Sequence, residues 1–290
     1  MSGSITERLI DVSFSLGTGP TGQGAGETYT YSGLRVTANI VEAGGFISPT
    51  GQFTIYGMPP AEMNKISSLG LYALRARNNV ITVSAGDAVN GMSQVFSGQI
   101  LEAYIDFANA PDAAFQVSSL DALNVQLSPA TATGFNGGVP VATIMQTLAT
   151  QMGYSFQNNG VTSLLSNPYF PGSLADQVKA CAVAANINYQ MRQGVLAIWP
   201  KYSPRGGAIP TISPETGMIG YPSFASNGLA LRTLFNPEIM IGGQVNVQSS
   251  LTAACGNWMI FQLAHTLESQ TPNGMWESQI YAMHSLEGVS

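Results

Sequence analysis

The chain has 290 residues, of which only 9% are Asp, Glu, Lys or Arg, against roughly 25% in a typical soluble domain. This length allows one large domain or two to three smaller ones, with enough buried surface to fold without a metal or a disulfide. The net charge is −6 and the ten basic residues are scattered singly. That pattern excludes the basic patch needed for specific nucleic-acid binding.

The scarcity of charge requires a physical explanation. A free monomer usually stays soluble by covering its surface with mixed charges, whereas interface cores are depleted in Lys, Glu and Asp because desolvating a charge is costly. A subunit covered by neighbours inside a ring or tube would show this composition. A secreted or low-charge binding protein, with a surface of Ser, Thr, Asn, Gln and Gly, explains the composition equally well. In a tube that conducts DNA, mild repulsion from the lining would prevent sticking.

Alternating apolar and polar residues predict β-structure in the first part of the chain. Within Thr28–Glu42, the residues of one face at period two are Leu34, Val36, Ala38 and Ile40. The other strands predicted here are Leu9–Leu16, Phe53–Tyr56, Asn79–Ala85, Gln94–Phe107, Phe115–Ser118 and Leu123–Leu127. Pro59 and Pro60 precede a short predicted helix over Ala61–Leu69, which Gly70 closes. Strands at this spacing favour a sandwich or a barrel.

The middle of the chain has a helical periodicity instead. After a Thr/Gly-rich linker over Thr131–Gly138, Pro140 opens a predicted helix. Its apolar face comprises Val141, Ile144, Met145, Leu148 and Met152. A second helix is predicted to begin at Ser173, with Asp176 completing a variant capping box. Its apolar face comprises Leu174, Val178, Cys181 and Ala185. Two predicted strands follow, Asn188–Met191 and Val195–Trp199, so residues 139–200 form a small α/β unit.

The last part returns to β-structure after the Pro/Gly-rich stretch Ser203–Pro210. Its predicted strands are Leu229–Leu234, Glu238–Ile241, Gln244–Gln248, Trp258–Leu267 and Trp276–Met283. The pair formed by the last two strands echoes the earlier pair Gln94–Phe107 and Phe115–Ser118, and each pair has a proline in its connection. This echo suggests that the two β-rich parts are duplicates.

The segment from Gly17 through Gly19 to Gly22 matches the G-x-G-x-x-G dinucleotide-binding pattern. That chemistry needs a helix N-terminus directly after the glycines, to direct amide groups at a pyrophosphate. Here a strand signal follows from Glu27 instead, so the sequence favours a flexible loop and no nucleotide cofactor is expected.

Histidines and carboxylates give no positive sign of catalysis or metal binding. The only histidines are His265 and His284, and neither has a His or Cys at metal-ligand spacing. His265 alternates in phase with apolar neighbours, which favours a packed histidine over a triad member. Asp106 and Asp112 flank a predicted turn, a common solvated location. Nothing indicates the paired carboxylates of a glycosidase, so we expect no catalytic, cofactor or metal site.

The remaining aromatic and cysteine residues favour structural roles. Trp258 and Trp276 fit strand packing better than a sugar-binding platform. Cys181 is predicted to be a buried thiol and Cys255 lies in a loop-like stretch, so assembly in a reducing cytoplasm is expected. The first eight residues, 1–8, lack the features of a signal peptide, and no apolar run is long enough to cross a bilayer. We therefore expect a soluble chain without membrane insertion.

Three groups of segments together resemble the baseplate hub proteins of contractile-tailed phages, the Mu- and T4-type hubs. The first group is Phe53–Met58 with Met63 and Ile66 of the following helix. The second group is Ile81–Asp87, Val95–Ile100, Ala108–Asp112 and Phe115–Val117. The third group is Leu234–Gly242, Val245–Val247, Trp258, Leu263–Glu268 and Trp276. Each motif alone has low specificity, and together they span nearly the whole chain.

The resemblance implies a mainly β fold in which two tube-like β-barrel domains, 1–130 and 206–290, flank a small α+β domain, 139–200. It implies a non-enzymatic homotrimer whose pseudo-sixfold ring joins the tail tube protein to a separate spike protein. The expected partners also include other baseplate proteins and the tape measure, in a virion assembled in the host bacterial cytoplasm. DNA would pass through the ring without sequence-specific binding.

Two other interpretations stay open at this stage. A distal tail or tube protein, or a type VI secretion hub, would share the same barrel. A cell-wall-binding or cell-wall-hydrolysing protein belongs to a different class.

Overall fold

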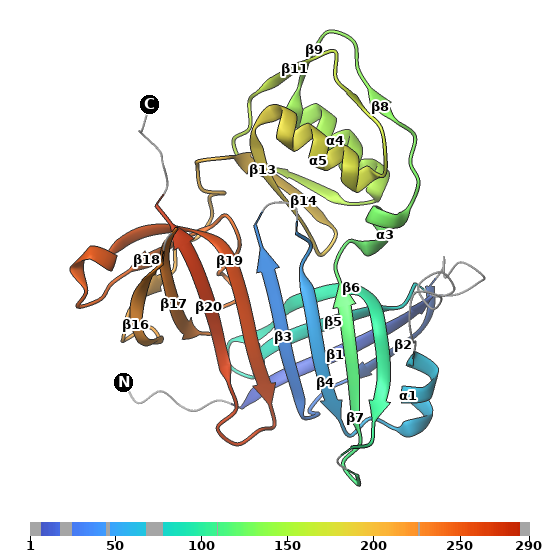
Figure 1. Cartoon of the computed structure of the whole chain (residues 1–290). Helices are drawn as coiled ribbons and strands as arrows, with labels where there is room; N and C mark the ends of the chain where they lie inside the picture. Colours follow the sequence, from blue (N-terminus) through green and yellow to red (C-terminus); the bar gives the residue numbers. More distant parts are fainter. Residues whose placement is uncertain are drawn as a thin grey trace. The chain divides into compact units, whose positions relative to one another are not determined.

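The computed structural model describes residues 7–17, 25–44, 47–67, 78–108, 110–225 and 227–284. The chain consists mainly of antiparallel β-strands with a few short helices (Figure 1), so the predicted mainly β class is confirmed. It divides into two compact units, of which the first comprises residues 1–41, 49–121 and 264–277. The second comprises residues 42–48, 122–263 and 278–290. The predicted boundaries at 1–130, 139–200 and 206–290 stay a prediction.

The first unit is built on antiparallel strands in the order β3-β4-β7-β6-β5-β1-β2. Its elements are β1 (Arg8–Gly17), β2 (Ala25–Tyr31), β3 (Val36–Ala43), β4 (Thr50–Tyr56), α1 (Pro60–Ile66), β5 (Val80–Asp87), β6 (Gly91–Asp106) and β7 (Ala114–Leu120). Strand β3 lies in this unit up to Val41.

Strand β6 makes this sheet fold over on itself. Its first half pairs with β5 and its second half with β7, and the register shifts between Ile100 and Glu102. The two halves of the sheet then face each other through aromatic side chains. The ring of Phe14 lies 6.0 Å from that of Phe115, and Phe53 lies 5.3 Å from Phe96. Figure 1 shows the result: β1 and β5 cross behind β3, β4 and β7.

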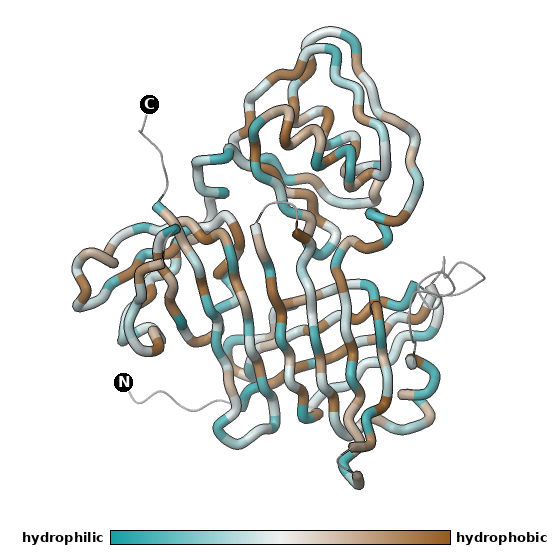
Figure 2. Tube along the Cα trace, in the orientation of Figure 1, coloured by the Kyte–Doolittle hydropathy of each residue, from teal (hydrophilic) through white to brown (hydrophobic). Residues whose placement is uncertain are grey.

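The core of the first unit follows the period-two alternation of its strands, visible in Figure 2 as alternating hydropathy along each strand. In β3 the predicted face is confirmed, because Val36, Ala38 and Ile40 are fully buried. The predicted stretch Thr28–Glu42 is nevertheless two strands. Gly33, with a φ of 71°, lies between β2 and β3, and a positive φ favours glycine.

The short helix α1 begins at Pro60, one residue before the predicted start at Ala61, and buries Met63 and Ile66. It ends at Ile66 rather than at Leu69, because Ser67 has an extended conformation (φ −52°, ψ 127°) and directs both its N–H and its hydroxyl to the carbonyl of Met63. Positions 68–70, where the end of the helix was predicted, lie outside the described residues.

The second unit begins with an α/β part. Its elements are α3 (Leu123–Leu127), β8 (Thr133–Gly134), β9 (Gly138–Pro140), α4 (Val141–Met152), β10 (Ser155–Asn158), β11 (Leu164–Ser166), β12 (Tyr169–Phe170), α5 (Leu174–Ala185), β13 (Ile187–Arg192) and β14 (Val195–Pro200). Strands β10, β14 and β13 form a sheet in that order. Both predicted helices are confirmed, and α5 has the predicted capping box between Ser173 and Asp176.

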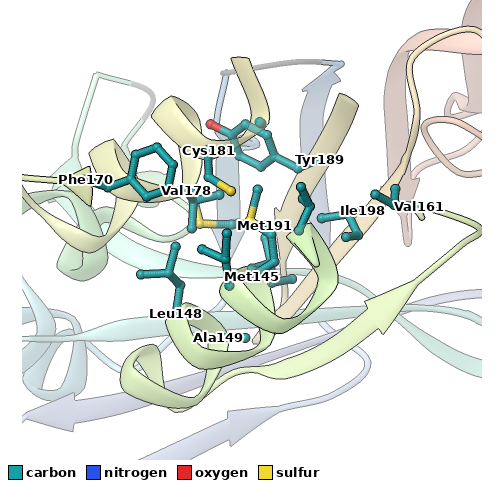
Figure 3. Packing of buried hydrophobic residues seen from close by; sticks show 14 of the residues in the cluster. Met145, Leu148, Ala149, Val161, Phe170, Val178, Cys181, Tyr189, Met191 and Ile198 are labelled. Atoms are coloured by element: carbon teal, nitrogen blue, oxygen red, sulfur yellow. The ribbon is translucent and has the colours of Figure 1, made fainter. Parts of the chain in front are cut away.

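Helices α4 and α5 pack with β13 and β14 around one apolar cluster (Figure 3). Fully buried members include Ile144, Met145 and Leu148 of α4 and Val178 and Cys181 of α5. Cys181 is a free thiol, and burial raises its pKa to about 12, which suits an inert packing residue. The predicted structural role of Cys181 is confirmed.

Strand β14 is buried on both faces, which ties two cores of the second unit together. Its residues Leu196 and Ile198 belong to the cluster under the helices. The alternating residues Ala197 and Trp199 belong to a second cluster that includes Ile241 and Trp258. Residues on a strand point alternately to opposite faces, so this strand forms the layer between the helices and the remaining strands.

The remaining strands of the second unit follow the α/β part. They are β15 (Thr211–Ile212), β16 (Met218–Ala225), β17 (Gly228–Leu234), β18 (Gln244–Val247), β19 (Gly256–Ser269) and β20 (Trp276–Met283), with the 3-10 turn η1 (Thr252–Ala254). The order is β16-β17-β20-β19, and β18 pairs with both β19 and β15. Strands β19 and β20 contribute residues to both units. Among the described strands, the order ends openly at β2 and at β16, so no pairing closes a barrel.

Two predicted strands are wrong. Leu123–Leu127 alternates like a strand but forms α3, because Ala122 has a left-handed φ of 58° and the turn closes through helical bonds such as Ser128 N–H to Asn124 O (3.0 Å). Glu238–Ile241 is a turn, because the Asn236 side chain accepts the N–H of Glu238 at 2.9 Å. The predicted linker Thr131–Gly138 also contains β8 and the start of β9, which pair with β12 and β11.

The helix-covered cluster should be sensitive to truncation. Replacing Leu148, which is fully buried, by Ala should lower the free energy of unfolding by about 2–5 kcal/mol through lost burial and a residual cavity. Gln146→Ala, at an exposed position of the same helix, should change it by less than about 0.5 kcal/mol. Denaturant unfolding of both variants measures the difference, and similar losses in the two would contradict the assigned core.

Candidate functional site

The most distinctive surface of the first unit consists of two rows of side chains that cross four strands in register. The first row contains Asn39 of β3, Gln52 of β4, Ser118 of β7 and Glu102 of β6. The second row contains Thr37, Thr54, Gln116 and Tyr104 of the same strands. We call these eight residues the polar rows. Seven of them line a shallow groove of about 290 Å³, together with Phe53 and Val117.

The polar rows are positioned by the apolar face beneath them. On the neighbouring positions of the strands, Ala38, Phe53, Ala103 and Val117 are buried, so the opposite side chains must point outward. A cross-strand hydrogen bond from Thr54 Oγ1 to Gln116 Oε1 (2.8 Å) links β4 to β7. The rows are therefore fixed in place by a packed core and by continuous strand pairing.

These four strands carry an unusual charge pattern. None of β3, β4, β6 and β7 contains a Lys or an Arg. Their carboxylates are Glu42, which is buried, and Glu102 and Asp106. Asp106 accepts the N–H of Ala108 at 2.8 Å, as expected for the turn predicted there. Amides and hydroxyls form hydrogen bonds but offer no fixed positive charge, so this surface does not attract an anionic polymer.

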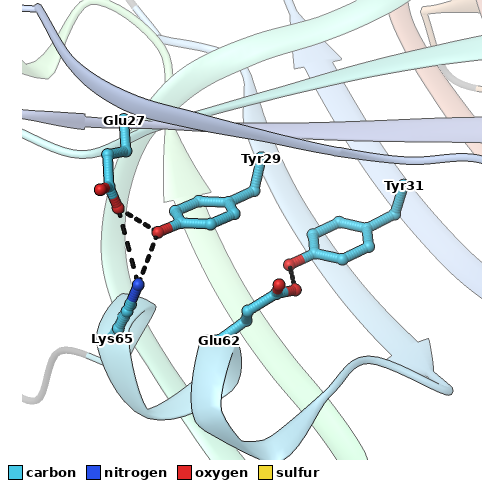
Figure 4. A network of polar contacts seen from close by, with 5 residues as sticks. All are labelled: Glu27, Tyr29, Tyr31, Glu62 and Lys65. Atoms are coloured by element: carbon cyan, nitrogen blue, oxygen red, sulfur yellow. Dashed lines mark hydrogen bonds and ion pairs between the residues drawn. The ribbon is translucent and has the colours of Figure 1, made fainter.

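A small charged network lies elsewhere in the first unit, between β2 and α1 (Figure 4). Tyr29 donates a hydrogen bond to Glu27 and accepts one from Lys65 Nζ at 3.0 Å, while Tyr31 donates to Glu62. The Tyr29 hydrogen bond and then the Lys65 charge lower the pKa of Glu27. Burial, followed by the bond to Glu62, raises the pKa of Tyr31. The network holds the helix against the edge strand β2.

The second unit contains a buried charged cluster. The carboxylate of Glu42 is 1% exposed, and its Oε1 lies 2.8 Å from Nε of Arg192. Gln190 Nε2 donates to Glu42 Oε2 at 3.1 Å. Arg205 donates through Nη1 to Gln190 Oε1 at 3.0 Å and through Nη2 to Gln157 Oε1 at 2.7 Å. A chain of polar contacts thus runs from Glu42 to the α/β part of the same unit.

The strand register explains how one guanidinium reaches both glutamines. Gln157 of β10 and Gln190 of β13 both pair with Ala197 of β14, which lies between them. The small side chain of Ala197 leaves room for Arg205 to bridge the two amides. Burial, and then repulsion from Arg192, lowers the pKa of Arg205, while Glu42 opposes that shift. Among the described residues of this cluster, Glu42 is the only carboxylate, so its one negative charge faces the two guanidinium groups of Arg192 and Arg205.

An apolar pocket of about 350 Å³ also lies in the second unit. It is lined by Gly44, Asn188, Trp199, Lys201, Tyr202, Ile241, Gly242, Met259, Ile260, Phe261, Met283 and His284. None of these described lining residues is Asp or Glu, so the pocket does not supply the pair of carboxylates that glycoside hydrolysis uses.

The structure places the residues weighed in the sequence at separate positions. His265 is a buried residue of β19, and the ring of His284 lies 3.8 Å from that of Trp258, which is itself buried in the second unit. Gly17 ends β1 and a strand follows, as predicted, while Gly19 and Gly22 lie outside the described residues. Within the described part of the chain, no group of three His, Cys, Asp or Glu residues could hold a metal ion. No helix found there is long and apolar enough to span a membrane.

The sequence interpretation missed the polar rows and the burial of Glu42, although the alternation of residues along the strands indicates both. Glu42 continues the alternation of Val36, Ala38 and Ile40, so its own position in β3 predicts burial. The polar rows occupy the complementary positions of their strands, and their lack of cations is visible in the sequence. What the alternation could not supply is the pairing of these strands with one another.

Solved structures share this fold at very low sequence identity. A 43 kDa tail protein of prophage MuSo2 from Shewanella oneidensis matches with a TM-score of 0.62 at 9% identity, covering 95% of this chain and 97% of that one. A tail protein from Neisseria meningitidis MC58 matches with a TM-score of 0.62 at 9% identity, covering 94% and 96%. No curated protein sequence matches the chain significantly.

A third matching structure is a protein of a secretion system. The E. coli protein c3393, described as a type VI secretion component similar to the T4 tail proteins gp27 and gp5, matches with a TM-score of 0.55 at 9% identity, covering 86% and 73%. The fold therefore belongs to a class that includes phage tail proteins and a secretion component. Residues 10–278 match the family described as baseplate hub gp41, and the chain belongs to this family. It is a structural protein of the phage tail baseplate, which confirms the predicted resemblance.

The buried charged cluster predicts a strong coupling between two residues. Glu42→Gln should lower the free energy of unfolding by about 2–3 kcal/mol, somewhat less than for a wholly buried pair, because the Arg192 side chain is 23% exposed. The double variant Glu42→Gln/Arg192→Met should lose less than the sum of the two single losses. A double-mutant cycle by denaturant unfolding measures this, and additive losses would argue against the ion pair.

The network of Figure 4 predicts a change in titration. Tyr29→Phe should raise the pKa of Glu27 toward its ordinary value, and Lys65→Met should raise it less, following the order of the two causes. Folding lowers the pKa of Glu27, so its interactions stabilise the folded protein fully at a pH above the ordinary carboxyl pKa. This stabilisation is lost as the pH falls through the lowered pKa of the folded protein. NMR titration of the Glu27 carboxyl measures the shift, and an unchanged pKa in Tyr29→Phe would refute the assigned cause.

Proposed function

We propose that three copies of this chain form a closed ring at the baseplate hub, which joins the tail tube to the central spike and lets DNA pass during ejection. In each copy, two tube-like β-domains, at about residues 1–130 and 206–290, would form the ring. The α/β domain at 139–200 would lie outside it. The single observation that carries the proposal is the match to the baseplate hub family over residues 10–278.

The open strand edges support assembly into a ring. Among the described strands, β2 pairs only with β1 and β16 pairs only with β17, so each presents unpaired backbone groups along one side. Exposed edges favour pairing with another chain, and a head-to-tail contact whose rotation closes produces a ring. Pro222 and a register shift interrupt β16, which limits the length over which a neighbour could pair there.

Exposed aromatic residues and the low charge support the same assembly. On β16, Tyr221 is 73% exposed and Phe224 is 60% exposed. Aromatic side chains are enriched in interface cores, where charged residues are rare. With only 9% charged residues, the chain has little of the charge cover that a free monomer uses. Both observations favour a surface that neighbours cover.

The proposed partners are the tail tube protein, a spike protein, other baseplate proteins and the tape measure. The chain would assemble with them in the bacterial cytoplasm before the virion leaves the host. Both cysteines are free thiols, Cys181 buried and Cys255 exposed, which suits a reducing compartment. The likeness to c3393 favours, as a second candidate, an equivalent hub role in a secretion machine.

The proposed ring can be tested by its mass and symmetry. Light scattering of the chain alone at micromolar concentration should show a species of three times 30.5 kDa, and addition of the tube and spike proteins should give a heavier complex that contains three copies of the chain. Images of that species should show a threefold ring with a central hole. A persistent 30.5 kDa monomer in the presence of both partners would contradict the proposal.

A further inference from the structure

We propose that the polar rows line the channel of the ring and form a surface to which DNA does not adhere. This inference rests on the proposed function, because it requires a ring through which DNA passes. It assigns the passage to one face of the first unit, crossed by Asn39, Gln52, Ser118 and Glu102 and by Thr37, Thr54, Gln116 and Tyr104.

The first argument is the distribution of charge. Duplex DNA carries about one negative charge per 1.7 Å, and proteins hold it mainly through Lys and Arg. The polar rows contain one carboxylate and no cation, and the strands that carry them contain no Lys or Arg. A surface of this kind offers a moving phosphate backbone neutral dipoles and mild repulsion, so no contact retains it.

Two of the three described cations of the first unit, Arg8 and Lys65, are held by partners outside the rows, and the third, Arg35, lies beside the rows. Arg8 donates to the carbonyl of Gly274 at 2.6 Å and lies over Trp276. Lys65 binds Tyr29 in the network of Figure 4. Arg35 lies before the start of β3, 4.7 Å from the centre of the Tyr56 ring, next to the rows but not within them. The lack of positive charge on the rows is therefore local.

The second argument is that the rows do not resemble a protein-binding surface. Interface cores are built around aromatic and aliphatic anchors, but Tyr104, at 42% exposure, is the one large ring in the rows. The other seven side chains are short or medium-sized amides, hydroxyls and one carboxylate. Their positions are fixed by buried side chains on the reverse face, so the surface is rigid, shallowly grooved and uncharged except for Glu102. These properties suit passage rather than docking.

The test compares two double variants of the polar rows that differ only in the sign of the charge they add. Asn39→Lys/Gln52→Lys adds two cations at exposed, directly opposed positions, and Asn39→Asp/Gln52→Glu adds two anions at the same sites. Repulsion between opposed like charges affects both variants similarly. Gln146→Lys/Gln151→Lys, on the exposed face of α4, adds the same two cations elsewhere on the chain. Each chain is incorporated into virions, and the rate of DNA release from triggered particles is measured.

The Lys pair in the rows should slow DNA release roughly tenfold at about 50 mM salt and much less at about 200 mM, because salt screens phosphate contacts. The acidic pair and the α4 control should release DNA at the unaltered rate. Normal release from particles that contain the Lys pair would overturn the assignment. Exclusion of both the Lys pair and the acidic pair from assembled tails would also overturn it, because it would identify the face as a packed interface.

The two proposals fail in distinguishable ways. If the unaltered chain is absent from the tail or never forms a ring, the proposed function fails before any substitution is made. If ring-containing particles form and release DNA normally with the Lys pair, only the assignment of the face fails. A change in tail length with normal DNA release would assign the face to the tape measure instead, which also overturns the inference.

Discussion

The structure depends on one constraint, the strict alternation of side chains in paired β-strands. In β3, β4, β7 and β6 the register aligns apolar residues on one face, so the polar residues form continuous rows on the other. A slip of one residue would exchange the two faces. The core beneath, with Phe53 and Phe115 among its fully buried residues, therefore determines which side chains reach the surface.

Strand β14 plays the corresponding part in the second unit. Because it is buried on both faces, its residues alternate between the cluster under α4 and α5 and the cluster around Trp258. Ala197 fits between Gln157 and Gln190, which leaves space for the guanidinium of Arg205. Buried charges are tolerated only when they are paired, and the 2.8 Å contact between Glu42 and Arg192 meets that requirement.

The positions of the charged, polar and aromatic side chains show how the low charge of the chain is distributed over the structure. Charged groups are rare overall, and the most deeply buried described carboxylate, Glu42, is paired with Arg192. The polar rows consist of amides, hydroxyls and the single carboxylate Glu102, and the edge strand β16 carries exposed aromatic residues. In the proposed ring, a face without cations would suit the passage of DNA and an aromatic edge would suit contact with a neighbouring subunit.

The sequence by itself determined the mainly β class, the helices at α4 and α5 with the Ser173 cap, and the family resemblance, because these depend on local periodicity and short motifs. It did not distinguish a strand from a turn at Leu123–Leu127 or Glu238–Ile241, where the backbone conformation of Ala122 and the side chain of Asn236 decide. Only the tertiary structure joined Asn39, Gln52, Ser118 and Glu102 into one row, and Glu42 with Arg192 into one pair. Strand pairing brings together residues far apart in the chain, and local periodicity carries no information about which strands will meet.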